Sequence, residues 1–126
     1  MKHFYILLLF FIYSLRIAAY TSDSFDQNRI APKHEVRAVW LTTIGGIDWP
    51  HSYAQTSTSI EKQKNELRRI LNQLQSAGIN TVLLQTRVRG TVIYPSAIEP
   101  WDGCLSGRPG VSPGYDALQF AIDECH

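Results

Sequence analysis

The sequence predicts an α/β fold with parallel strands, because two short apolar segments alternate with two segments of helical periodicity. Residues 36–42 are rich in β-branched and aromatic side chains and precede Gly45 and Gly46, which predicts a buried strand. Residues 79–85 form a second predicted strand, and its centre, Val82–Leu84, is continuously apolar, as expected where both faces of a parallel sheet are covered. The order strand, helix, strand, helix implies right-handed crossovers between parallel strands.

The clearest predicted helix lies between the two strands. Thr58 and Glu61 have the spacing of a capping box, which predicts that the helix begins near Thr58. Apolar residues recur with helical period on one face, and Gly78 is suited to the left-handed conformation that ends a helix. The apolar face consists of Ile60, Leu67, Ile70, Leu71 and Leu74.

A second helix is predicted near the C-terminal end of the sequence. Ser112 and Pro113 are typical of a helix start, and apolar residues between Tyr115 and Cys125 recur at steps of three and four. No stop signal follows, and two parallel strands cannot close a sheet. Because a barrel of such units needs about 250 residues, we expect this chain to be the front end of a longer protein.

Residues 1–19 are interpreted as a secretory signal peptide. Lys2 supplies a cationic start, Phe4–Tyr13 is a short apolar run, and small residues precede a cleavage site after Ala19. The apolar run is well short of the roughly 20 residues that a membrane-spanning helix needs. An uncleaved membrane anchor is the alternative, although Arg16 interrupts the hydrophobicity early.

Residues 20–33 are polar and unpatterned, which predicts a flexible tail before a domain at 34–126. A signal peptide implies export to the periplasm, the cell envelope or the extracellular space, with membrane contact only through that peptide.

In an oxidising compartment Cys104 and Cys125 could form a disulfide. The alternative is a free Cys125 that is buried on the apolar face of the last helix.

Charge and composition exclude several classes of function. With 12 Lys and Arg residues against 11 Asp and Glu, the net charge is +1, too little for a strongly basic nucleic-acid binder. A hydrophobic content of 44% with 18% charged residues is typical of a globular domain. Two cysteines rule out a disulfide-dense scaffold and a four-cysteine zinc site. Because metal-ligand spacings and dinucleotide or phosphate-binding motifs are missing from the sequence, no metal or cofactor is expected.

Three stretches of the sequence together resemble the exported family 10 glycosyl-hydrolase-like proteins. They are residues 35–50, with Ala-Val-Trp-Leu-Thr-Thr and Ile-Asp-Trp-Pro; residues 78–96, with Gln-Thr-Arg-Val-Arg-Gly and Tyr-Pro-Ser; and residues 99–118, with Glu-Pro-Trp and Gly-Tyr-Asp-Ala-Leu. The resemblance covers residues 35–126 and implies a (β/α)8 TIM barrel, of which this truncated chain holds the first two βα units. It also implies hydrolysis of O-glycosidic bonds in a polysaccharide or cell-envelope glycan, with carbohydrate as the partner.

The same resemblance implies that the catalytic residues lie elsewhere. Glycosidases of this barrel group usually place two catalytic carboxylates on later strands, so this fragment would lack them and be inactive alone. Asp48, Glu99 and Asp102 are the carboxylates of the two loops, and a catalytic pair among them is the alternative. A non-catalytic carbohydrate-binding barrel and a metal-dependent deacetylase barrel are the alternative functions.

Two arginines after the second strand are candidate substrate ligands. Arg87 and Arg89 fall on the same side of an extended segment, and their planar guanidinium groups could bind sugar hydroxyls or a carboxylate. Gly90 allows the backbone a close approach beside Arg89. The alternative is a scaffold role, in which one arginine pairs with Glu99 or Asp102 and fixes the long loop.

Aromatic residues and one carboxylate complete the candidate site. Asp48 and Trp49 follow the first strand, and Tyr94 and Trp101 lie in the loop after the second. An aromatic ring offers an apolar face to the C–H groups of a sugar, while a carboxylate accepts hydrogen bonds from its hydroxyls. Packing of the loops is the alternative for each aromatic residue, and Trp40 is expected in the barrel core or facing a helix. The predicted carbohydrate-binding residues are Asp48, Trp49, Arg87, Arg89, Tyr94 and Trp101.

Overall fold

The structure, a computed structural model, describes residues 35–126. The predicted signal peptide (1–19) and the predicted tail (20–33) lie outside the described residues. The fold is therefore the fold of the domain that the sequence places after them.

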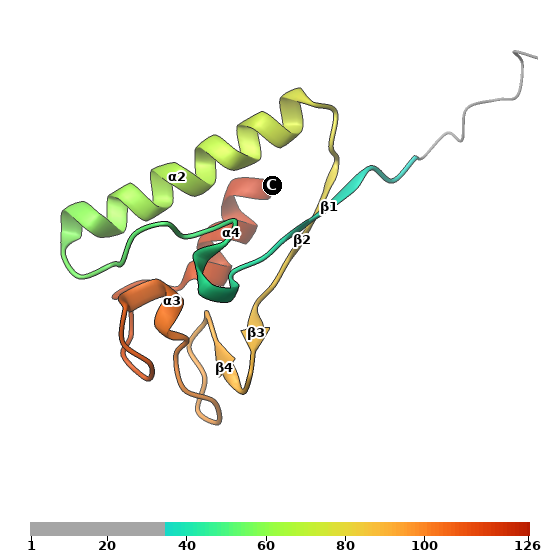
Figure 1. The fold of residues 1–126 in the computed structure, drawn as a ribbon. Helices are drawn as coiled ribbons and strands as arrows, with labels where there is room; N and C mark the ends of the chain where they lie inside the picture. The colour runs from blue at the N-terminus through green and yellow to red at the C-terminus, as the bar shows by residue number, and fades with distance from the viewer. Residues whose placement is uncertain (1–34) are drawn as a thin grey trace, which may run out of the picture. The chain divides into compact units, whose positions relative to one another are not determined.

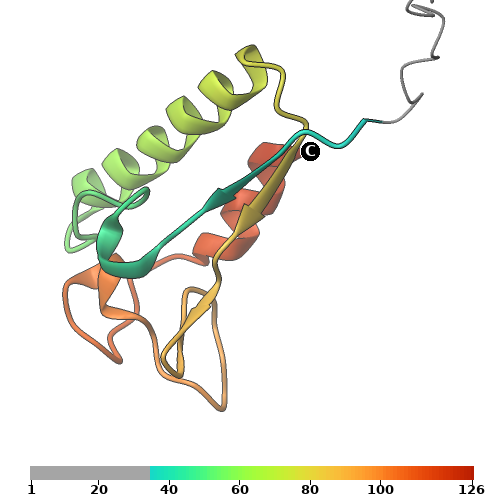
Figure 2. The same cartoon turned by 45° about the vertical axis from the view of Figure 1, so that its right-hand side comes forward.

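A pair of parallel strands forms the framework of this domain. Strand β1 (Ala38–Leu41) pairs with strand β2 (Thr81–Leu84), and Trp40 lies opposite Leu83 in the register. Figure 2 shows the two strands side by side and running in the same direction. Helix α2 (Ser57–Ser76) connects them (Figure 1). The predicted α/β class and the parallel direction of the two strands are confirmed.

Helix α2 begins earlier than the sequence predicted. Thr56 is the N-cap: its hydroxyl accepts a hydrogen bond from the Ser59 amide, and the Ser59 hydroxyl accepts one from the Thr56 amide. A capping box forms, but not with Thr58 and Glu61, because the run Thr-Ser-Thr-Ser offers several hydroxyl caps in succession. At the other end Gly78 has the predicted left-handed conformation, with φ of +80°.

The predicted long loop after β2 contains three short elements. Strands β3 (Arg87–Val88) and β4 (Thr91–Val92) form an antiparallel hairpin, and helix α3 (Gly103–Ser106) follows. Arg89 (φ +51°) and Gly90 (φ +77°) make the hairpin turn. Positive φ at both central residues is typical of the tight turns that match the twist of paired strands.

Helix α4 (Ala117–Cys125) begins later than the predicted start at Ser112 and Pro113. Gly114 has φ of +84°, and its amide donates to the Ser112 hydroxyl (3.1 Å), so the chain turns here instead of continuing as a helix. Asp116 is the N-cap, since its carboxylate accepts a hydrogen bond from a backbone amide of the first turn.

Both cysteines are free in the part of the chain that the structure describes. Cys104 is buried in α3, whereas Cys125 is exposed at the end of α4. Ala117 and Ala121 of α4 are buried in the core, which ends before Cys125. The prediction that Cys125 is buried is therefore wrong.

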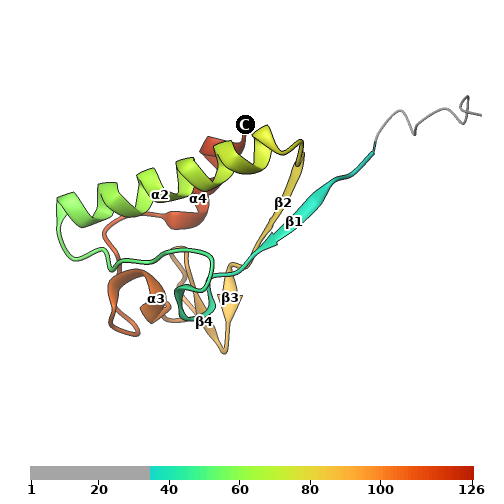
Figure 3. The same ribbon diagram turned by 45° about the horizontal axis from the view of Figure 1, so that its top comes forward.

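One part of the core lies between the β1–β2 pair and the helices α2 and α4, which lie on the same side of the strands in Figures 1 and 3. Leu41, Leu67 and Ala121 are buried there, and Val82 and Leu84 pack against them. The core continues into α3 and the loops, where Trp49, Ile93 and Leu105 are buried. None of the helices in residues 35–126 is long and apolar enough to cross a membrane.

The opposite face of the two strands is open in the described residues. Trp40 is 61% exposed and Leu83 is 49% exposed, since alternate side chains of a strand point to opposite faces. Trp40 therefore does not face the helices, and residues 35–126 do not cover it.

Candidate functional site

A cleft lies at the loops that follow the carboxyl ends of β1 and β2. It has a volume of about 710 Å³ and is bounded by the loop after β1, the β3–β4 turn and α3. In sheets of parallel strands, ligands bind at this end. Its polar and aromatic lining residues are His51, Ser52, Tyr53, Arg89, Thr91 and Asp102.

Gln85 joins the ends of the two parallel strands beneath these loops. Its Oε1 atom accepts hydrogen bonds from the Thr42 hydroxyl (2.5 Å) and from the backbone amides of Thr43 and Ile44 (3.2 Å each). The Thr43 hydroxyl in turn donates to the Gln85 carbonyl (2.9 Å). This network fixes the turn that leads to Gly45, which lines the cleft.

Replacing Gln85 with leucine is expected to lower the free energy of unfolding by about 2–4 kcal/mol, because several donors then lose their shared acceptor. Thr43 is only 1% exposed, so water cannot replace that acceptor. Gln85→Glu retains an acceptor oxygen and is expected to stay within about 1 kcal/mol of the wild type. Urea denaturation measures both variants, and equal losses would contradict the role of the acceptor.

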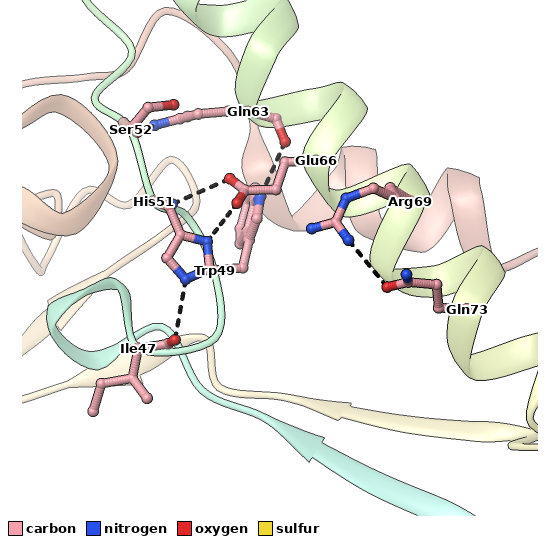
Figure 4. Close-up of polar contacts among 8 residues, drawn as sticks. All are labelled: Ile47, Trp49, His51, Ser52, Gln63, Glu66, Arg69 and Gln73. Carbon is pink, nitrogen blue, oxygen red and sulfur yellow. Dashed lines mark hydrogen bonds and ion pairs between the residues drawn. The ribbon is translucent and has the colours of Figure 1, made fainter.

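His51 anchors the loop after β1 to helix α2 (Figure 4). Its ring Nδ1 bonds to Glu66, its backbone amide donates to Glu66 Oε2 (3.1 Å), and its ring Nε2 lies 3.2 Å from the Ile47 carbonyl. The hydrogen bond with Glu66 and the charge of Glu66 raise the pKa of His51 above 6.5, and loss of solvent contact and the charge of Arg69 oppose this only in part. Because a protonated imidazole donates from both nitrogens, the charged form holds the loop best.

The contribution of His51 to stability is expected to fall as the pH rises. Its folded pKa lies above the unfolded value, so the contribution is fully present below about pH 6.5 and is lost as the pH rises through the folded pKa. Unfolding of the wild type and of Glu66→Gln, compared at about pH 5.5 and about pH 8.5, measures this contribution. The stability difference should shrink at the higher pH, and a constant difference would contradict the role of the charge. Glu61→Gln, on the same helix, is the control.

Arg87 is paired with Glu99. Its Nε donates to both Glu99 oxygens (2.7 and 2.8 Å), and these hydrogen bonds lower the pKa of Glu99. They also raise the pKa of Arg87, to which nearby Tyr94 makes a smaller contribution. The structure thus has the scaffold arrangement, in which this arginine fixes the long loop, although the Arg87 side chain remains 62% exposed.

Arg89 lines the cleft. Its φ of +51° is uncommon for any residue other than glycine, and such conformations cluster at functional sites. Nearby Asp102 accepts hydrogen bonds from the Thr91 hydroxyl and the Cys104 amide (2.7 Å). Burial acts to raise the pKa of Asp102, but these hydrogen bonds and the charge of Arg89 outweigh it and lower the pKa. Asp102 is therefore an ionised N-cap of α3 beside a cationic side chain.

The other predicted site residues are held by the fold. Trp49 is 0% exposed, and its indole Nε1 donates to the Gln63 carbonyl (3.0 Å), so its ring is not accessible for stacking on a sugar (Figure 4). Trp101 packs against the core. Asp48 accepts a hydrogen bond from the Thr42 amide (2.8 Å) at the end of β1. For Trp49 and Trp101 the structure matches the packing alternative, because the loops fold back onto α2 and the core.

Residues 35–126 match the protein family described as Glycosyl hydrolase-like 10. The chain belongs to this family. It is 40% identical over 92 residues to Glycosyl hydrolase YngK of Bacillus subtilis strain 168, and 38% identical over 95 residues to Glycosyl hydrolase DigH of Escherichia coli strain K12. The matches cover 73% and 72% of this chain but 18% and 22% of those relatives, so the chain spans about a fifth of their length. The resemblance to family 10 is confirmed.

The part that matches the glycosyl hydrolase-like 10 family contains the cleft and three residues whose roles the sequence did not reveal, of which Tyr53 lines the cleft. Gln85 carries a signal, since a polar residue that ends an apolar parallel strand lies where ligands bind. Gln63 carries none, because its partners lie as far as 52 positions away. Tyr53 is one aromatic residue among several, and only the fold places it in the cleft.

Within residues 35–126, no group of three or more His, Cys, Asp or Glu side chains is placed to hold a metal ion. The residues that line the cleft offer hydrogen bonding, positive charge and an aromatic surface, supplied by Arg89, His51 and Tyr53.

Proposed function

We propose that this chain forms the N-terminal part of an exported (β/α)8-barrel enzyme that hydrolyses O-glycosidic bonds in a polysaccharide or cell-envelope glycan. Strand β1 with α2, and β2 with α4, would be its first two βα units, and residues 1–19 would direct export. The parallel register supports the barrel, as do Trp40 and Leu83 on the open face, which a barrel interior would cover. The observation that carries the proposal is a cleft at the carboxyl ends of parallel strands in a glycosyl hydrolase-like chain.

The cleft in residues 35–126 would bind the glycan, while the catalytic carboxylates would lie in other parts of the barrel. Each loop carboxylate is held by a structural partner: Asp48 by a backbone amide, Glu99 by an arginine, and Asp102 by a hydroxyl and an amide. A general acid must exchange a proton and a nucleophile must reach the sugar, and these contacts oppose both. They argue against a catalytic pair within this part of the chain.

Arg89→Ala in the full-length protein tests the binding role of the cleft. We expect KM to rise about tenfold while kcat changes little, because Arg89 would bind substrate and transition state alike. The assay measures reducing ends released from cellulose, xylan, mannan, chitin-derived polymers and an isolated cell-envelope glycan. Arg69→Ala, which removes an exposed arginine of α2 outside the cleft, is the matched control and should leave both constants unchanged.

Two results would revise the proposal. If the wild-type protein releases no reducing ends from any glycan and binds none, the glycosidase function is contradicted. If it binds a glycan without hydrolysing it, the function is that of a non-catalytic carbohydrate-binding barrel, which the structural roles of the loop carboxylates also favour.

A further inference from the structure

One wall of the cleft is an aromatic ring that the sequence did not single out. Tyr53 lines the cleft and is 58% exposed. Trp49, which the sequence predicted as a sugar-stacking residue, lies in the same loop but is fully buried. The loop therefore has a different aromatic side chain available to a ligand.

The ring of Tyr53 packs against the backbone at Gly107, the residue that follows α3. Gly107, at the end of α3, has φ of +79°, and a Cβ atom at this position would lie 2.9 Å from Cγ of Tyr53. A glycine is therefore needed both for the turn and for the close approach of the ring. The contact fixes one side of the ring without covering the rest of it.

The backbone on both sides of Tyr53 is also fixed. The amide of Ala54 donates to the Leu105 carbonyl (2.7 Å), and the carbonyl of Ser52 accepts a hydrogen bond from the Gln63 side chain. A ring that is positioned before binding loses little conformational entropy when a ligand arrives. Tyr53 therefore has the preorganised placement expected of a binding residue.

The cleft that Tyr53 lines also holds a cationic side chain. Arg89 lines the same cleft, and its positive charge acts on Asp102. An exposed aromatic ring and a guanidinium donor in one cleft match a pyranose, whose C–H groups lie on its faces and whose hydroxyls lie at its edge.

We propose that Tyr53, supported by Gly107, is the stacking surface for a pyranose ring of the glycan, with Arg89 donating hydrogen bonds to sugar hydroxyls. The proposal rests on the proposed function, since it specifies how the cleft would bind carbohydrate. It assigns the stacking role to Tyr53 in place of Trp49.

Binding without hydrolysis tests this assignment in the full-length protein. Saturation-transfer NMR with cellohexaose, xylohexaose, mannohexaose, hexa-N-acetylchitohexaose and oligosaccharides of a cell-envelope glycan identifies the bound sugar, and titration gives its Kd. Tyr53→Ala is expected to raise Kd roughly tenfold, and Tyr53→Phe to keep it within about threefold, because stacking uses the ring and not the hydroxyl. Both variants alter an exposed side chain, so thermal unfolding should confirm that they fold.

Gly107→Ala is a second variant for the binding experiment, and the chain offers a matched control for it. Its Cβ would displace the Tyr53 ring, and Kd should rise as in Tyr53→Ala. Gly110→Ala has the same φ of +79° but nothing within 4 Å of the added Cβ, so it reproduces the backbone strain and should leave Kd unchanged. If Gly107→Ala fails to fold, the Tyr53 variants alone decide.

The outcomes separate this inference from the proposed function. If the wild type binds a glycan and Tyr53→Ala binds it equally well, the stacking role is overturned and the proposed function stands. If the wild type binds none of the oligosaccharides, both are overturned. Loss of binding in Tyr53→Ala and Gly107→Ala, with binding kept in Tyr53→Phe and Gly110→Ala, is the result that supports the proposal.

Discussion

Trp49→Ala is expected to lower the free energy of unfolding by about 3–5 kcal/mol, enough to unfold a large fraction of a marginally stable domain. The side chain is fully buried beside α2, and its indole donates a hydrogen bond to the Gln63 carbonyl (3.0 Å). Truncation would leave a cavity the size of the indole ring and would detach the loop after β1 from the helix. Urea denaturation followed by circular dichroism measures the loss.

Two further variants make this prediction specific. Trp49→Phe keeps an aromatic ring but removes the indole donor, and we expect a smaller loss of about 1–2 kcal/mol. Ile98→Ala, at a position 93% exposed, should change stability by less than about 0.5 kcal/mol. If Trp49→Ala kept full stability and weakened only glycan binding, the ring would be a ligand-binding surface and its buried placement would be wrong.

Gln63→Met is expected to cost about 2–4 kcal/mol although it keeps the length and shape of the side chain. Gln63 is 0% exposed, and its Nε2 donates to the carbonyls of Ser52 and Leu105 (2.8 Å to Leu105). Its Oε1 accepts a hydrogen bond from the Tyr115 hydroxyl (2.9 Å). A thioether satisfies none of these groups, so methionine would leave the Ser52 carbonyl and the Tyr115 hydroxyl without this partner and would remove one of the two donors to the Leu105 carbonyl.

The control for Gln63→Met is available on the same helix. Gln75 is exposed on α2, and Gln75→Met should change stability by less than about 0.5 kcal/mol. Thermal and urea unfolding of both variants measures the difference. Equal stabilities would mean that the hydrogen bonds of Gln63 do not hold the cleft loop and α3 to the helix.

Local sequence patterns predicted which elements form but misplaced their ends. The apolar run at 79–85 and the helical stripe of α2 identified the second strand and the helix, since both patterns arise from neighbours in the chain. The predicted first residues of the helices were wrong where several neighbouring residues could serve as the N-cap. Thr56 caps α2 in place of Thr58, and Asp116 caps α4 in place of Ser112. An N-cap residue must have an extended backbone conformation, which depends on the path of the preceding loop.

The candidate site was predictable in location but not in composition. That ligand-binding loops follow parallel strands is a rule of topology, and Arg89 beside Gly90 stood out from the local turn. Exposure is different, because it depends on what else packs nearby. Trp49 and Tyr53 lie in the same loop, yet the first is buried against α2 and the second is exposed in the cleft.

By itself the sequence determined the α/β class, the parallel strands and the family, because apolar periodicity and short motifs are properties of contiguous residues. Only the tertiary structure decided which side chains reach the cleft and which hold it together. Gln63 bonds to groups 42 and 52 positions away, and Tyr53 rests on Gly107 of a different loop. Such contacts form only after the chain has folded, so no local pattern can encode them.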